Sequence, residues 1–317
     1  MRLRRSRSDM VHRDMGSGLP GGHSIQMKPI LLWLALLALV AGCLRPTLAP
    51  EPAAHFNGDK AYTWVTQQCD LGYRIPGTEA HRRAGDLIVE TLRSLGWTIG
   101  EQTFTYQGTP VRNILAWQGS GPAILLGAHY DTRPLADREP ANQPVLGAND
   151  GASGVAVLLE LARTLDVART GHTVYLAFFD AEDSGDLNGW PWIVGSTYMA
   201  DHWGNNGEPT LDAAIIIDMI GDADLNIYLE RNSDPHLSAA LWDTAGQLGF
   251  SEVFITEYRY AILDDHLPFT QRGIPAVDII DFDYPYWHTT HDTPDKVSPD
   301  SLTAVGRTLE TWLEGKD

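Results

Sequence analysis

The stretch Ala123-Ile124-Leu125-Leu126-Gly127-Ala128-His129-Tyr130-Asp131 decides the fold class of this chain. Its first six residues are small or apolar, as in a buried strand, and the run then stops at a histidine and an aspartate. Nineteen residues after Asp131 comes Asp150, within the segment GANDGASG at residues 147–154, and a helical pattern follows from 155 to 165. A buried strand leading into a helix favours an α/β sheet, which binds ligands at the carboxyl ends of its strands.

Further apolar runs repeat this pattern along the chain. The alternation of strands and helices predicts an α/β fold, a single domain with a mostly parallel central sheet and helices on both faces. The expected strands cover residues 98–106, 111–117, 123–128, 172–179, 213–218, 253–257 and 276–280, and the expected helices cover 58–70, 79–95, 152–165, 193–201, 235–248, 267–272 and 301–313.

The N-terminal segment is predicted to be an export signal. After Met27 and Lys28, residues 30–41 form an apolar run of twelve residues. A bilayer span needs roughly 20 residues, so this run indicates a signal-peptide core. The sequence VAGC at residues 40–43 resembles the lipobox of bacterial lipoproteins, which are cleaved before the cysteine and acylated on it. An ordinary signal peptide with an incidental cysteine is the alternative.

The expected organisation is an N-terminal extension and signal peptide at residues 1–42, a lipidated tether at 43–57 and a folded domain at 58–317. Pro46, Pro50 and Pro52, with few apolar residues between them, indicate a flexible tether. We expect the mature protein to be exported and held by a lipid anchor at Cys43. It would lie at the outer face of the bacterial cell membrane or in the periplasm.

The charge and cysteine content limit the possible partners and ligands. The whole sequence has a net charge of −18, and residues 1–42 carry six basic and two acidic side chains, so the remainder is near −22. Such an acidic surface argues against nucleic acid and anionic membranes as partners. Cys43 and Cys69 are the only cysteines, so any metal must be bound by histidine and carboxylate.

Acidic residues follow the apolar run at 174–179 in the segment DAED at residues 180–183. Adjacent carboxylates repel one another and need a cation or a shared proton. Because alternation points Glu182 and Asp183 in different directions, one can bind a metal while the other faces a substrate as a proton carrier. The alternative for this segment alone is a solvated acidic turn.

Similar clusters stand at the later strand ends. Asp218 ends the apolar run at 214–217. Asp264 and Asp265 precede a short helix, and the alternative is that they only cap its first turn. In the segment WHTTHDT at residues 287–293, His288 is the better ligand candidate and His291 is expected at the surface. Because acids and histidines gather where strands end and not where they begin, the sequence predicts a metal site at one edge of the sheet.

These motifs resemble those of the zinc aminopeptidases of the M28 clan, in order and over nearly the whole chain after the signal. They are RIPGT at 74–78, GAHYD at 127–131, GANDGASG at 147–154, FDAED at 179–183, DMIG at 218–221 and WHTTHDT at 287–293. Three details are more similar to the glutaminyl cyclases (glutaminyl-peptide cyclotransferases) of that clan. They are FFDAED followed by the loop WPW at 190–192, the segment DDHLPF at 264–269, and the tryptophan directly before His288.

The resemblance implies a role for each cluster. Asp150, Asp183 and His288 would hold the zinc ion that both branches share. His129 and Asp218, with Asp150 bridging, would form a second metal site in an aminopeptidase, whereas in a cyclase that site commonly stays empty. One zinc ion is therefore expected for a cyclase and two for an aminopeptidase.

The resemblance also implies the catalytic group. In a cyclase, Asp218 and Asp264 would form a hydrogen-bonded acid network with the catalytic Glu182. Many clan members have glutamate where this chain has Asp183, and the shorter arm would still coordinate zinc while moving it slightly.

The resulting interpretation is a zinc-dependent acyltransferase that converts the N-terminal glutamine of peptides or proteins to pyroglutamate with release of ammonia. The γ-carbonyl would be polarised by zinc and attacked by the substrate's own α-amine, with Glu182 carrying the proton. Trp190 or Trp192, with Trp287, would wall a pocket that excludes water. The alternatives are an aminopeptidase on the same fold and a catalytically silent lipoprotein that only binds. The intact Glu182 weighs against the second of these.

Overall fold

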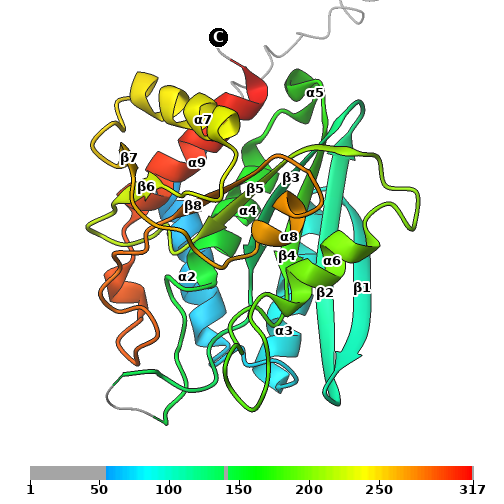
Figure 1. The fold of residues 1–317 in the computed structure, drawn as a ribbon, viewed down its shortest axis with the longest axis vertical. Helices are drawn as coiled ribbons and strands as arrows, with labels where there is room; N and C mark the ends of the chain where they lie inside the picture. Colours follow the sequence, from blue (N-terminus) through cyan, green and yellow to red (C-terminus); the bar gives the residue numbers. More distant parts are fainter. Residues whose placement is uncertain (1–54, 139–141, 316–317) are drawn as a thin grey trace, which may run out of the picture. The chain divides into compact units, whose positions relative to one another are not determined.

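The computed structural model of the protein describes residues 55–138 and 142–315 (Figure 1). The predicted signal peptide, Cys43 and most of the predicted tether lie outside these residues. Within the described ranges, no helix has both the length and the apolar character needed to cross a membrane. Strands and helices alternate along this part of the chain, as the sequence predicts.

The described chain begins with two helices, α2 (Gly58–Asp70) and α3 (Glu79–Ser94). Each starts at a side-chain cap, because Asn57 accepts from the backbone N–H of Lys60 and Thr78 accepts from that of His81. Both helices bury an apolar face against the same side of the sheet. The polar caps and the apolar stripe together explain why these two segments match their predicted ranges closely.

The predicted boundary between the tether at 43–57 and the folded domain lies too far toward the C-terminus. Phe56 is buried in the core, and its ring lies where a side chain on Gly306 of the last helix, α9 (Pro299–Glu314), would stand. The backbone N–H of Phe56 also donates to Oε1 of Glu310 at 2.9 Å. The apolar side chain at 56, between polar neighbours, therefore belongs to the packed domain.

A six-stranded sheet forms the centre of the domain, with the strand order β1-β2-β4-β3-β5-β8. Strand β2 pairs antiparallel with both of its neighbours, and the pairs from β4 to β8 are parallel. The parallel strands therefore bring their carboxyl ends to one edge. The six strands are β1 (Thr98–Tyr106), β2 (Thr109–Gly119), β3 (Ala123–His129), β4 (Thr173–Phe179), β5 (Leu211–Asp218) and β8 (Ala276–Ile280).

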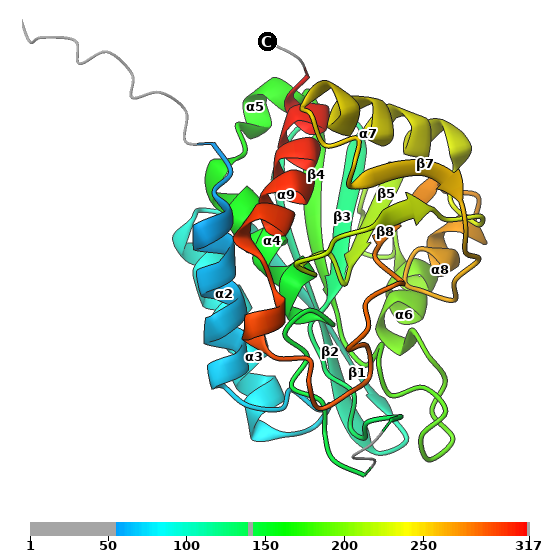
Figure 2. The ribbon, with the colours of Figure 1, turned by 90° about the vertical axis from the view of Figure 1, so that its left-hand side faces the viewer.

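Helices cover both faces of this sheet, as predicted (Figure 2). In β3, Ile124 and Leu126 face the larger core beneath α2, α3, α4 (Ala152–Thr164), α7 (Pro235–Gln247) and α9. Leu125 faces the smaller core beneath α6 (Val194–His202) and α8 (Leu267–Thr270). Burial on both faces explains why β3 and β4 read as continuous apolar runs in the sequence.

The strand predicted at 253–257 does not join the central sheet. It forms β7 (Phe254–Tyr258), which pairs in parallel with the short strand β6 (Ile227–Leu229) in a separate two-stranded sheet. The sequence analysis did not predict β6, because three residues are too few to show a periodic pattern. It also did not predict the short helices α5 (Val167–Thr170) and η1 (Pro294–Lys296).

Candidate metal centre

Three side chains from separate loops meet at the carboxyl edge of the sheet. Asp150 precedes α4, Asp183 follows β4, and His288 follows β8. One ligand atom from each lies within 4.8 Å of the others. Nε2 of His288 is 3.0 Å from Oδ1 of Asp183 and 3.7 Å from Oδ2 of Asp150. The three residues predicted as metal ligands are therefore close enough to bind one ion together.

The chemistry of this group fits a divalent metal. All three side chains are buried, and among the described residues neither oxygen of Asp183 nor Oδ2 of Asp150 has a hydrogen-bond partner. Buried carboxylate oxygens without partners are costly unless a cation or a proton compensates them. Two carboxylates and one imidazole are a donor set that zinc accepts.

A second group of possible ligands adjoins the first and shares Asp150 with it. Nε2 of His129 is 3.1 Å from Oδ1 of Asp150 and 3.2 Å from Oδ1 of Asp218. One ligand atom from each of these three residues also lies within 4.8 Å of the others. The second site predicted from His129 and Asp218 is thus assembled, with Asp150 between the two positions.

Asp131, the acid of the His-x-Asp motif, holds the loop that follows β4. Its Oδ1 accepts from the backbone N–H of Glu182 at 3.1 Å, and its Oδ2 accepts from that of Asp183 at 3.2 Å. Oδ1 also lies 3.5 Å from Nδ1 of His129. One buried carboxylate therefore fixes the backbone of both Glu182 and Asp183.

Asp292 does the same for the loop that carries Asp150. Its Oδ1 accepts from the backbone N–H of Asn149 at 2.9 Å, and its Oδ2 accepts from that of Asp150 at 3.1 Å. The hydroxyl of Tyr284 donates to Oδ1 at 2.7 Å. Asp292 lies in the WHTTHDT motif, but nothing in the sequence pattern predicts this role for it.

Arg74, from the RIPGT motif, is a fully buried arginine that ties together the two ends of the loop between β3 and α4. Its Nε donates to the carbonyl oxygen of Tyr130, and its Nη2 donates to that of Gly147. The loop that carries Asp150 is thereby fixed to the loop before α3.

Three site loops contain a residue other than glycine in the left-handed backbone region. Ala181, directly before Glu182, has φ 57°, Met219, directly after Asp218, has φ 47°, and His288 itself has φ 55°. Such conformations cost on the order of 1–3 kcal/mol each and occur where surrounding contacts impose them. The strand-end loops are thus held in sharp turns that aim their polar side chains at one another.

Burial and neighbouring charges shift several pKa values at the site. Burial, followed by the charge of Asp150, raises the pKa of Asp183 to about 6, and burial raises the pKa of Asp218 to about 7. Burial would lower the pKa of His288, but the surrounding carboxylates, Asp183 first, raise it to about 9. Burial also raises the pKa of Glu182 well above its ordinary value, and nearby acids add to the rise.

These shifts predict a pH-dependent effect of zinc on stability. A group with a raised pKa binds more protons in the folded state, so its contribution to stability is lost as the pH rises through the folded value. Metal binding displaces those protons and relieves the repulsion. We expect the zinc-induced rise in melting temperature to be larger at about pH 8 than at about pH 5.5. Thermal unfolding with and without zinc at both pH values measures this, and an equal rise at both would contradict it.

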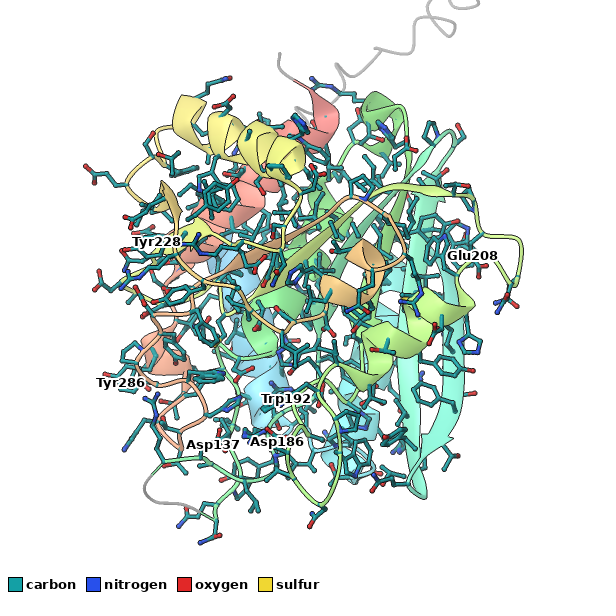
Figure 3. The ribbon with its side chains drawn as sticks, viewed as in Figure 1. Asp137, Asp186, Trp192, Glu208, Tyr228 and Tyr286 are labelled. Carbon is teal, nitrogen blue, oxygen red and sulfur yellow. The ribbon has the colours of Figure 1, made fainter. Side chains whose placement is uncertain are left out.

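Aromatic side chains lie beside the metal-ligand group. The ring of Trp192 is stacked on that of His288, with centroids 5.6 Å apart and planes at 5°, and Trp287 packs against the same imidazole at 4.0 Å. Figure 3 labels Trp192 together with Asp186, whose Oδ2 accepts from Nε1 of Trp192 at 3.3 Å. Trp192 and Trp287 thus both contact the imidazole of His288, and their role as pocket walls stays a prediction.

Trp190 lies elsewhere. Its ring packs against Tyr106 of β1, with centroids 4.9 Å apart, in a small apolar cluster that includes Val111 and Val194. Of Trp190 and Trp192, only Trp192 stacks on His288, whereas Trp190 lines a separate surface pocket with Ser184 and Leu187. His291 is exposed, as predicted.

Of the predicted hydrogen-bonded network of Asp218, Asp264 and Glu182, the structure shows only that the charge of Asp264 affects the other two acids. The charge of Asp264 contributes to the raised pKa of both other acids, after burial. No hydrogen bond joins Asp264 to either of them within the described part of the chain. One ligand atom of Asp264 instead lies within 4.8 Å of ligand atoms of His266 and Asp278, and all three side chains are buried. The network itself stays a prediction.

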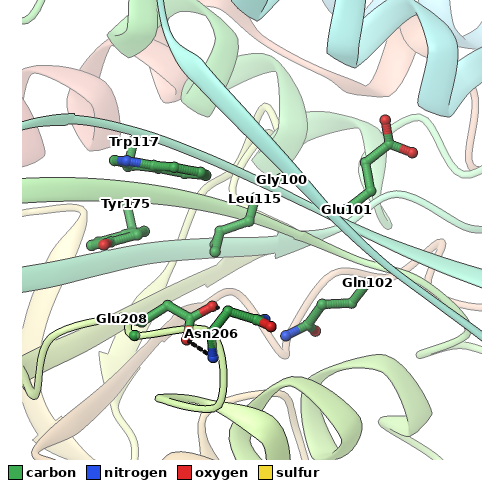
Figure 4. Close-up of a pocket in the computed structure, with 9 residues that line it drawn as sticks. Gly100, Glu101, Gln102, Leu115, Trp117, Tyr175, Asn206 and Glu208 are labelled. Atoms are coloured by element: carbon green, nitrogen blue, oxygen red, sulfur yellow. Dashed lines mark hydrogen bonds between the residues drawn. The ribbon is translucent and has the colours of Figure 1, made fainter.

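A separate surface pocket contains none of the predicted site residues. It lies over β1, β2 and β4, where the rings of Trp117 and Tyr175 stack, and Glu208 from the loop after α6 closes one side (Figure 4). Trp117 and Tyr175 are register partners near the amino end of β4. The candidate metal ligands lie at the opposite edge of the sheet, at the carboxyl ends of the parallel strands.

Comparison with known proteins identifies this arrangement. Residues 113–313, more than half of the chain, match the family described as Peptidase family M28. The chain belongs to peptidase family M28. The match begins in β2 and runs through all three metal-ligand loops.

Similar proteins carry two kinds of name. The glutaminyl-peptide cyclotransferase of Drosophila melanogaster is 26% identical over 288 residues, which cover 77% of this chain and 78% of the relative. The solved structure of Porphyromonas gingivalis glutaminyl cyclase is 38% identical, with a TM-score of 0.74, and the match covers 81% of this chain and 98% of that one. A leucine aminopeptidase precursor from Bacteroides thetaiotaomicron is 32% identical, with a TM-score of 0.78, covering 84% and 99% of the two chains.

These relatives show that this M28 protein is an enzyme with the fold of zinc exopeptidases and glutaminyl cyclases. Family membership also implies zinc, which agrees with the buried carboxylate oxygens of Asp150 and Asp183 that form no hydrogen bond among the described residues. The residues present therefore fit the metal on structural grounds as well as by relationship.

Proposed function

We propose that this M28 protein is a zinc-dependent glutaminyl-peptide cyclotransferase with one zinc ion held by Asp150, Asp183 and His288. Its substrates are peptides or proteins with an N-terminal glutamine, and its products are the pyroglutamyl chain and ammonia. The observation that carries this proposal is Glu182, a buried carboxyl beside a three-residue ligand group that two tryptophans enclose. Bound zinc would supply Lewis-acid polarisation of the γ-carbonyl.

The reaction needs a group that moves one proton. The α-amine nitrogen attacks the carbonyl carbon (Cδ) of the side-chain amide, the carbon–nitrogen bond of that amide breaks, and ammonia leaves. A buried carboxyl with a raised pKa, as at Glu182, suits a group that takes a proton from the α-amine and returns it to the departing nitrogen. Because Asp131 fixes the backbone of Glu182, the carboxyl is positioned before substrate binds.

The walls of the site limit competing chemistry. Water attacking the same carbon would give glutamate instead of pyroglutamate. The rings of Trp192 and Trp287 both pack against His288, and they would supply flat apolar surfaces for a compact, ring-closing substrate in place of water. Proximity of the amine and the carbonyl within one glutamine lowers the entropic part of the barrier.

An aminopeptidase is the second candidate, because His129, Asp150 and Asp218 form a second ligand group that shares Asp150. With two ions, Glu182 would deprotonate a water for attack on the first peptide bond. The assembled second group is the specific observation in its favour.

One assay separates the two activities. We expect the zinc-loaded protein to release ammonia from glutamine β-naphthylamide and to leave leucine p-nitroanilide uncleaved. Mass spectrometry of a peptide with N-terminal glutamine should show the loss of one ammonia. Cleavage of leucine p-nitroanilide without ammonia release would overturn the cyclase proposal in favour of the peptidase.

We further propose that the protein is exported and anchored by a lipid on Cys43. The support is the lipobox-like VAGC at residues 40–43, after an apolar run too short to span a bilayer. In a bacterial host, the wild-type chain should incorporate labelled palmitate, and a Cys43→Ser variant should incorporate none. Equal incorporation by the two would contradict the anchor.

A further inference from the structure

We infer that Asp137 and Arg133 are positioning residues for the metal ligands His288 and Asp183. Neither has a role in the sequence prediction, and the inference rests on the proposed binding of zinc to this group. The two residues lie in the loop between β3 and α4, ahead of Asp150. They touch the loops of the other two ligands and no reacting atom.

Asp137 holds His288 at two points. Its Oδ2 is 2.5 Å from Nδ1 of His288, and its backbone N–H donates to the carbonyl oxygen of His288 at 3.0 Å. The carboxylate therefore fixes the ring, and the backbone bond fixes the peptide that carries it. Because His288 has a left-handed φ of 55°, both contacts help to impose a conformation that the residue would otherwise avoid.

The carboxylate also selects the useful form of the imidazole. A carboxylate at Nδ1 favours a proton on that nitrogen, which leaves the lone pair on Nε2. Nε2 is the atom 3.0 Å from Asp183 and 3.7 Å from Asp150, so it is the nitrogen that faces the other two ligands. Asp137 thus directs the coordinating nitrogen of His288 toward the metal position.

Arg133 extends the contact to Asp183. Its Nε and Nη2 donate to Oδ1 of Asp137 at 3.0 and 2.7 Å, and its Nη1 donates to the carbonyl oxygens of Asp183 and Gly185 at 3.2 Å each. Only 3% of the Arg133 side chain is exposed. The guanidinium of Arg133 thus links the loop that carries Asp183 to Asp137, the residue that holds His288.

The same guanidinium lies over the ring of Trp192, 4.7 Å from its centroid, and Trp192 is stacked on His288. The contacts therefore close a ring from His288 through Asp137, Arg133 and Trp192 back to His288. Figure 3 labels Asp137 and Trp192 at the site. Movement of the imidazole would disturb several contacts at once, so the ligand geometry is set before metal binds.

The test is the zinc affinity of metal-stripped protein, measured by competition with a chelator of known affinity. Loss of an outer hydrogen bond to a ligating histidine typically weakens metal binding about 10–100-fold. We expect Asp137→Ala to raise the Kd for zinc by that factor, and Asp137→Asn, which keeps an acceptor but loses the charge, to lie between Ala and wild type. The matched control is Asp201→Ala, which removes a more exposed aspartate that is also paired with an arginine, Arg272.

A second readout separates positioning from general stability. The Asp137 side chain is 41% exposed, so its removal should change the melting temperature of the zinc-free protein little and reduce the rise caused by zinc. An unchanged zinc Kd in both Asp137 variants would overturn the inference. A fall in the zinc-free melting temperature as large as the fall with zinc would also overturn it. If wild-type protein itself binds no zinc, the proposed function fails instead.

Discussion

Replacement of Glu182 by glutamine is expected to lower kcat for pyroglutamate formation by roughly 10²–10⁴-fold. Glutamine has nearly the same shape but cannot take a proton from the α-amine or return it to ammonia. Glu182 is not one of the three proposed zinc ligands, so the variant should keep its metal. Steady-state assays of ammonia release, together with zinc analysis of the same preparation, measure both effects.

Glu160→Gln provides a matched control for this change. Glu160 is also a buried glutamate, but it lies in α4 and pairs with Arg163, away from the metal ligands. Its variant should keep its turnover, even if its stability falls. Normal turnover by Glu182→Gln would remove Glu182 from the mechanism, and joint loss of zinc and activity would assign it a structural role instead.

Replacement of Asp183 by asparagine should remove tightly bound zinc and, with it, the activity. Asparagine occupies the same space but offers a neutral oxygen where the structure places a buried carboxylate with no hydrogen-bond partner among the described residues. The loss of affinity should exceed the roughly 10–100-fold that follows from changes outside the ligand set. Chelator competition and activity at graded zinc concentrations measure it.

Asp183→Glu is the informative companion, because it keeps the charge and lengthens the arm. It should retain zinc, with a changed kcat that reflects the shifted position of the metal. Retention of wild-type zinc affinity by Asp183→Asn would show that the ion is bound by other residues. The second group, formed by His129, Asp150 and Asp218, would then be the site to examine.

The position of the metal site could be predicted from the sequence because of how parallel strands are arranged. An apolar run marks a buried strand, and the polar residues at its end must lie at the edge that its parallel neighbours share. Asp218 ends β5 and Asp183 lies in the loop after β4, and the structure places both at the predicted edge. The choice of Asp150, Asp183 and His288 as zinc ligands depended on the resemblance to the M28 clan, because strand ends alone do not distinguish which acids bind the ion.

The residues that orient these ligands could not be predicted in the same way. Asp137 meets His288 across 151 positions of sequence, from a loop with no periodic pattern. Arg133 looks like any charged loop residue, although it is buried. Such roles depend on loop conformation, which strand and helix periodicity does not determine.

The direction in which a loop side chain points could not be predicted from the sequence either. Trp190 and Trp192 are two residues apart, and only the turns around them send one ring to Tyr106 and the other to His288. Asp186, Asn188 and Ile193 take left-handed backbone conformations in this segment, and none of them is glycine. The sequence therefore carried no signal for these turns.

The position of Asp150 between the two ligand groups has a consequence for zinc stoichiometry. The carboxylate of Asp150 would contribute its charge to an ion at either position, so the first ion bound would reduce the electrostatic attraction for a second ion. The two occupancies are then thermodynamically linked, and the number of ions per chain follows the free zinc concentration. A titration of bound against free zinc would describe this protein better than a single count from one preparation.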